Sequence, residues 1–84
     1  MARLRFQPGY SKAANLMSFV FYATDGNQRF PCYVGREQIA EVNGLDSGDE
    51  ERFFDLTQAH QCAQQSYNEH GLDADGSLQV ELQR

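Results

Sequence analysis

The stretch Leu16–Gly35, LMSFVFYATDGNQRFPCYVG, consists of two apolar runs around a turn and predicts a β-hairpin. Side chains on a strand alternate between its two sides. Along the second run, one side carries Phe30, Cys32 and Val34, and the other carries Arg29, Pro31 and Tyr33. A loop of even length adds Met17, Phe19 and Phe21 to the apolar side, whereas a three-residue loop mixes the two sides and is rejected. The hairpin therefore has one side that we expect to face the core.

Two registers are compatible with an even loop. A turn at Asp25-Gly26 fits type I′, and a turn at Gly26-Asn27, or a four-residue loop around it, shifts the pairing. In the first register, Pro31 lies opposite Val20 at a hydrogen-bonded position. Proline has no N–H and cannot donate the hydrogen bond that this position needs. The second opposes Pro31 to Tyr22 at a non-hydrogen-bonded position, and we prefer it. Pro31 then faces outward, which predicts a strand edge at that point.

The remaining elements follow from alternation, helical spacing and turn residues. Tyr10 to Asn15 is polar and is expected to be a loop. The predicted elements besides the hairpin are a strand at Leu4–Phe6, helices at Arg36–Asn43 and about Gly48–His70, and a strand at Ser77–Leu82. This order, β-β-β-α-α-β, predicts an α+β fold with two layers, in which an antiparallel or mixed sheet has both helices on one face. The edge that the last strand joins stays open.

The long helix has clear end signals. Ser47 and Glu50 have the spacing of a capping box at its start, and Gly71 fits the residue that follows its end. Its expected buried stripe is Phe53, Leu56, His60, Ala63 and Tyr67. Asp73-Ala74-Asp75-Gly76 lacks the later ligands of a calcium loop and is interpreted as a turn.

Length and charge restrict the class of protein. Eighty-four residues predict a single domain, 1–84, with a small core. The net charge of −5 argues against a nucleic-acid partner, and the arginines Arg3 and Arg5 are interpreted as strand-flanking residues that favour solubility. No apolar run approaches the roughly 18 residues of a membrane span. Two cysteines without an export signal predict a cytoplasmic protein with free thiols.

No residue pattern indicates a catalytic, cofactor or metal site. The soft ligands are Cys32, His60, Cys62 and His70, and none has the spacing of a zinc site. His60 lies in an apolar stripe, where a hydrogen-bonded histidine at the boundary of the core is the ordinary explanation. A small-ligand or enzymatic role would use His60 with a nearby carboxylate, Asp55 or Glu69, and is the alternative hypothesis.

The other side of the hairpin is the candidate functional surface. It carries Val20, Tyr22, Pro31 and Tyr33, and tyrosines beside apolar residues are typical of protein interfaces. Cover by the N-terminal segment, through Phe6 and Tyr10, is a competing explanation that stays open. The hypothesis is a non-enzymatic interaction module that binds a protein partner or a second copy of itself through this face.

The hairpin and the helices also resemble a known family of small bacterial proteins. The residues that carry the resemblance are Phe19-Val20-Phe21, Asp25-Gly26, Phe30-Pro31-Cys32-Tyr33-Val34, Arg36-Glu37-Gln38-Ile39, Phe53-Phe54, the helix through Ala63 and Tyr67, and Asp75-Gly76-Ser77-Leu78-Gln79-Val80. The chain is similar in this pattern to domain-of-unknown-function family fourteen-eighty-eight (DUF1488). The resemblance implies a compact α+β fold and no activity. An asparagine–arginine pair of the family pattern is replaced here by Ala59-His60, so no role of that arginine carries over.

Overall fold

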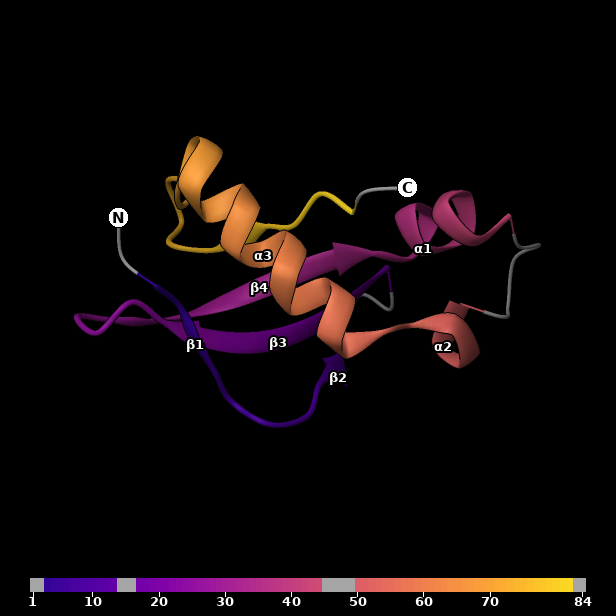
Figure 1. Cartoon of the computed structure of the whole chain (residues 1–84), viewed down its shortest axis with the longest axis horizontal. Coiled ribbons are helices and arrows are strands. Elements are labelled where there is room, and N and C mark those ends of the chain that lie inside the picture. The colour runs from indigo at the N-terminus through magenta and orange to yellow at the C-terminus, as the bar shows by residue number, and fades with distance from the viewer. Residues whose placement is uncertain (1–2, 14–16, 45–49, 83–84) are drawn as a thin grey trace.

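The computed structural model describes residues 3–13, 17–44 and 50–82 and shows one sheet with helices packed on it (Figure 1). The elements are β1 (Arg5–Phe6), β2 (Ser11–Lys12), β3 (Ser18–Thr24), β4 (Arg29–Gly35), α1 (Arg36–Asn43), α2 (Glu50–Phe53), α3 (Leu56–His70) and β5 (Leu78–Gln79). Strands pair in the order β1-β3-β4-β5, and β2 also pairs with β3. Among the strands of the described residues, only the β4–β5 pair is parallel, so the α+β fold with a mixed sheet is confirmed.

The hairpin has the register that Pro31 favours. Tyr22 lies opposite Pro31, and the last pair before the loop is Thr24 with Arg29, which leaves a four-residue loop. The pairing of β4 with β5 begins one residue after Pro31, at Cys32 and Leu78. At position 31 the backbone nitrogen points away from β3, toward the side where β5 has not yet begun. Proline at this position therefore removes no hydrogen bond from either strand pair.

The side of the hairpin predicted to be apolar forms the core. In Figure 1, α3 crosses the sheet over β3 and β4. The buried residues that pack together are Leu4, Phe19, Phe21, Ala23, Phe30, Cys32, Val34, Ile39, Ala59, Cys62, Ala63, Leu78 and Val80. The residues that α3 adds to this cluster are two alanines and a cysteine, and small side chains allow a helix backbone to approach the sheet closely. Met17 is the exception, because its side chain is 59% exposed.

The prediction of a loop from Tyr10 to Asn15 is wrong at Ser11–Lys12, which form β2 against β3. Both residues are exposed and polar, so their pairing depends on backbone hydrogen bonds and leaves no apolar pattern in the sequence. β1 and β2 both pair antiparallel with β3 and together form one edge of the sheet. The segment that connects β1 to β2 bulges away from β3. Phe6 opposes Ala23 and Ser11 opposes Val20, so four residues of the edge face two residues of β3.

The prediction of one long helix from about Gly48 to His70 is also wrong. The chain forms α2 and then α3, and between them Asp55 has an extended backbone with φ −102° and ψ 105°. Its carboxylate accepts a hydrogen bond of 3.2 Å from the backbone N–H of Gln58, which makes it the N-cap of α3. The capping residue proposed at Ser47 lies outside the described residues.

The break between α2 and α3 decides which phenylalanine enters the core. Phe54 stacks on Phe19 with ring centroids 4.9 Å apart, and the ring of Tyr10 meets it edge-on at 4.6 Å. Phe53, which the helical stripe predicts to be buried, is 48% exposed. Packing of one aromatic ring on the sheet therefore overrides the continuous 3.6-residue pattern.

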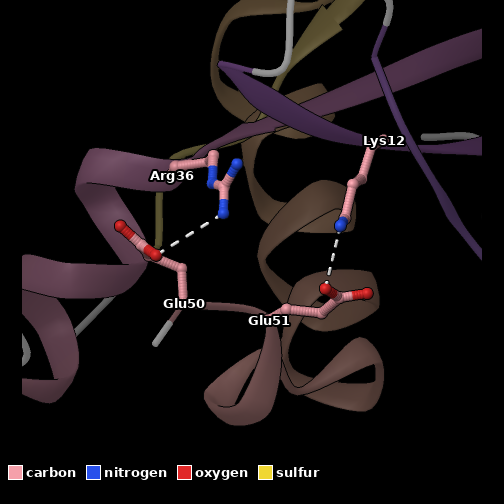
Figure 2. Close-up of polar contacts among 4 residues, drawn as sticks. All are labelled: Lys12, Arg36, Glu50 and Glu51. Carbon is pink, nitrogen blue, oxygen red and sulfur yellow. Dashed lines mark ion pairs between the residues drawn. The ribbon is translucent and has the colours of Figure 1, made fainter. Parts of the chain in front are cut away.

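Within the part of the chain that the structure describes, two ion pairs connect α2 to other elements (Figure 2). Glu50, at the start of α2, lies 3.6 Å from Arg36 at the start of α1, and its side chain is only 8% exposed. Glu51 lies 3.0 Å from Lys12 of β2, where both side chains are about half exposed. The buried pair is the stronger anchor, because water and salt screen exposed pairs.

Replacing Asp55 by alanine is expected to lower the free energy of unfolding by about 1 kcal/mol, because the first turn of α3 loses its cap. Asp73→Ala is the matched control, since Asp73 is an exposed aspartate in a turn. Urea denaturation followed by circular dichroism measures both variants. Equal destabilisation by the two changes would show that the cap does not stabilise α3.

Candidate interaction surface

The side of the sheet opposite the core carries the residues predicted for an interface. We call it the outer sheet face and define it by Val20, Tyr22, Pro31 and Tyr33. Register brings these residues together, because Val20 lies opposite Tyr33, and Tyr22 lies opposite Pro31. Cross-strand partners share a face, so the four side chains form one continuous group.

The four residues are not equally accessible. Tyr22 is 38% exposed, whereas Val20 is only 7% exposed. Pro31 and Tyr33 are partly buried. Val20 lies on the central strand between Ser11 and Tyr33, so its neighbours in the sheet cover it. Val20 therefore forms the floor of the outer sheet face, and Tyr22 is the residue that a partner would contact most directly.

The proposed cover of this face by Phe6 and Tyr10 is not found. The Phe6 ring stacks on His60 at 4.1 Å and contacts Phe21, both on the core side of the sheet. The Tyr10 ring meets Phe19 and Phe54, also on the core side. The rings of Phe6 and Tyr10 therefore add to the core instead of covering the outer sheet face.

Two arginines, Arg5 and Arg29, extend the outer sheet face. The prediction from the sequence did not include them among its four residues. Arg5, Thr24 and Arg29 are successive cross-strand partners on β1, β3 and β4, so they form one row on this face. The guanidinium of Arg29 lies 4.5 Å from the centre of the Tyr22 ring, which is a cation–π contact. The signal was available in the sequence, because alternation puts Arg29, Pro31 and Tyr33 on one side of the strand.

A hollow of about 350 Å³ opens beside Tyr22. It forms where the edge formed by β1 and β2 bulges away from β3. Its lining residues are Gln7, Pro8, Gly9, Tyr10, Ser11, Val20, Phe21, Tyr22 and Arg29. Because Val20, Tyr22 and Arg29 all line it, the hollow is continuous with the outer sheet face.

The surroundings of His60 differ from those expected for a hydrogen-bonded histidine. The His60 ring lies between Phe6 and Phe21, with its centroid 4.1 Å and 5.1 Å from theirs. Its Nε2 is buried and has no hydrogen-bond partner, so the expected hydrogen-bonded histidine is not found. Burial among the rings lowers the pKa of His60 below its ordinary value. This environment favours the neutral imidazole.

The carboxylates proposed beside His60 have other partners. Asp55 accepts from the backbone of Gln58, and Glu69 accepts from the side chain of Gln65 at 3.2 Å. Both cysteines are free and buried, and burial raises the pKa of the Cys32 thiol to about 12. Cys32 is therefore protonated at neutral pH and is a poor nucleophile.

Two aspartates of the candidate motifs have structural roles. The Asp25 carboxylate accepts from the backbone N–H groups of Asn27 and Gln28 and from the Tyr67 hydroxyl, and these bonds lower its pKa. Asp75 accepts from the Ser77 hydroxyl and backbone N–H, which lowers its pKa and confirms a turn there. Within residues 3–13, 17–44 and 50–82, no three histidine, cysteine or acidic side chains gather into a metal site. No helix in these ranges is long and apolar enough to cross a membrane.

Comparison with known proteins shows similarity to a solved structure. No family model matches the chain, and no curated protein sequence matches it. The fold is similar to a crystal structure of a protein of unknown function from the DUF1488 family, from Shewanella loihica PV-4. The TM-score is 0.77 at 17% sequence identity, and the alignment covers 98% of this chain and 96% of that one. The chain thus has the fold of a DUF1488 protein, and the resemblance seen in its motifs is confirmed at the level of the fold.

Proposed function

We propose that this chain is a small bacterial, cytoplasmic protein without enzymatic activity, which binds a protein partner through the outer sheet face. The observation that carries the proposal is the composition of that face. It presents Tyr22 at 38% exposure beside Pro31 and Tyr33, on the side of the sheet opposite the packed helices. Tyrosine and arginine are among the residue types enriched at the energetic centres of interfaces.

The other notable features of the domain have structural roles, which supports the same proposal. The hairpin, the buried ion pair and the helix caps stabilise the fold, whereas the tyrosines of the outer sheet face lie outside the core. The buried, free cysteines fit a reducing compartment. The structural relative comes from a bacterium, which supports the assignment to bacteria.

Replacing Tyr22 and Tyr33 by serine is expected to abolish binding to the partner while the domain stays folded, because both rings lie outside the core. Immobilised wild type and variant, exposed to extract of the source organism, are compared for captured proteins, and light scattering reports self-association. Phe53→Ser is the matched control, since Phe53 is an exposed aromatic of α2. A wild type that is monomeric and captures the same proteins as the tyrosine variant would refute the proposal.

A small-ligand or enzymatic role at His60 is the second candidate. Its supporting observation is the buried Nε2 that has no partner, because a buried polar atom without a hydrogen bond sometimes marks a functional site. Thermal-shift screening of a ligand library tests it. A library in which no compound raises the melting temperature of the wild type more than that of His60→Phe would argue against this candidate.

A further inference from the structure

We propose that the partner of the outer sheet face is an acidic, extended segment of another protein, whose carboxylates pair with Arg5 and Arg29 and whose apolar side chain enters the hollow beside Tyr22. This inference rests on the proposed function and adds the chemistry of the partner. It depends on three features of the face, namely its charge, the spacing of its arginines and the hollow.

The outer face is positive in an acidic protein. The strand residues whose side chains share it are Arg5, Ser11, Ser18, Val20, Tyr22, Thr24, Arg29, Pro31, Tyr33 and Gln79. This set contains two arginines and no carboxylate, whereas the whole chain has a net charge of −5. Charge complementarity therefore favours an acidic ligand at this face.

Arg5 and Arg29 differ in their ion pairing from two other cations, Lys12 and Arg36. Lys12 and Arg36 pair with glutamates of α2 (Figure 2). Within residues 3–13, 17–44 and 50–82, no carboxylate lies within ion-pair distance of Arg5 or Arg29. Both arginines are exposed, so a partner can reach them.

The same charges disfavour a second copy of the chain on this face. A symmetric dimer uses the same patch of both copies. Such a dimer would bring four arginines into one interface to which these strands contribute no carboxylate, and like charges in an interface oppose association. The face therefore selects a different protein as its partner.

The spacing of the arginines suits an extended segment. Arg5 and Arg29 are separated by one strand, so their backbones are about 10 Å apart. Carboxylates two residues apart on a strand lie on one side at about 7 Å. The long arginine side chains can span the difference. Two carboxylates match two arginines, whereas an oligonucleotide brings a phosphate with every nucleotide.

The hollow gives a place for one apolar side chain. Its volume of about 350 Å³ is at the low end of small-ligand pockets and suffices for one large aliphatic or aromatic group. Arg29 and Tyr22 line the hollow and also belong to the charged and aromatic part of the face. A segment that pairs with Arg29 therefore passes the mouth of the hollow.

The test uses a fluorescein-labelled peptide, Glu-Ser-Glu-Ser-Leu-Ser-Glu-Ser-Glu, whose leucine shares one side of the strand with the glutamates. Fluorescence polarisation with the full chain is expected to show binding that weakens as salt increases. Arg5→Gln combined with Arg29→Gln is expected to weaken binding at least about fivefold. Arg52→Gln, which removes an exposed arginine of α2, is the matched control and is expected to bind like the wild type.

Two further probes separate the alternatives. The same peptide with glutamines in place of glutamates is expected to bind more weakly, and so is the peptide with glycine in place of leucine. The inference would be overturned if the acidic peptide did not bind. It would also be overturned if Arg52→Gln weakened binding as much as Arg5→Gln combined with Arg29→Gln. Tighter binding of an oligothymidylate would overturn it in favour of a nucleic acid. If proteins from the extract still require Tyr22 and Tyr33, the proposed function stands without this inference.

Discussion

Replacing Gln38 by alanine is expected to lower the free energy of unfolding by about 2–3 kcal/mol, because one side chain completes the end of the sheet. The Gln38 amide donates to the carbonyl of Val80 at 2.9 Å and accepts from the N–H of Leu82 at 2.9 Å. Removing the amide leaves two partly buried backbone groups without a partner, each at about 1 kcal/mol or more. For a domain of this size, we expect the melting temperature to fall by about 8–24 °C.

The effect is specific to the segment that follows β5. Of the predicted strand Ser77–Leu82, Leu78 and Gln79 pair with β4, and the N–H of Val80 donates to the carbonyl of Tyr33 at 3.0 Å. From the carbonyl of Val80 onward, the segment is bound by side chains of α1 and α3. Gln38 takes the place of a neighbouring strand, and the Ser66 hydroxyl accepts from the N–H of Glu81 at 3.1 Å. The C-terminal segment is therefore attached through α1 and α3 beyond the end of the sheet.

Two variants separate the hydrogen bonds from other effects of the Gln38 change. Gln38→Met keeps the length of the side chain and should lose as much stability as Gln38→Ala. Gln61→Ala removes an exposed glutamine of α3 and should change little. Urea denaturation gives the free energies, and hydrogen exchange reports the amide of Leu82. If Gln38→Ala behaves like Gln61→Ala, Gln38 does not hold the C-terminal segment.

The features predicted correctly from the sequence are those decided by local chemistry. Pro31 lacks a donor, which selects the register that opposes it to Tyr22. Gly44 adopts the left-handed conformation, with φ 65°, and ends α1 after Asn43 as predicted. Each of these features needs only one residue and its backbone geometry.

The errors occur where a distant contact decides the local structure. The helical spacing continues from Phe53 to Leu56, and only the sheet shows that Phe54 has to stack on Phe19. A signal for the break existed, since Asp55 followed by Gln58 has the spacing of a capping box. Likewise, pairing of Ser11–Lys12 through the backbone has no apolar signature.

The alternation of side chains predicted the four residues of the outer sheet face. It did not predict that the face is positively charged. Alternation on β4 is enough to group Tyr33, Pro31 and Arg29 on one side. The contribution of Arg5 depends on the pairing of β1 with β3, which the sequence does not specify. The hollow beside Tyr22 depends on the bulge between β1 and β2, and this bulge requires the unpredicted strand β2.

Replacing His60 by phenylalanine is expected to raise the free energy of unfolding by about 1 kcal/mol at pH 8, because the change removes a buried Nε2 without a hydrogen-bond partner. The ring between Phe6 and Phe21 is kept. A phenylalanine in this aromatic site makes the same kind of contact without a polar atom to desolvate. The gain therefore measures the cost of the unpaired nitrogen.

The gain is expected to grow as the pH falls. Burial lowers the pKa of His60 in the folded protein below its ordinary value near 6.5, so the unfolded chain binds a proton more readily. The wild type therefore has its full stability above about pH 6.5 and loses stability as the pH falls toward the folded pKa. Urea denaturation of wild type, His60→Phe and His70→Gln at pH 8, 6.5 and 5 tests this, with His70→Gln controlling for the loss of one exposed histidine. Stability curves of the wild type and His60→Phe that run parallel across this range would show that His60 titrates alike in both states.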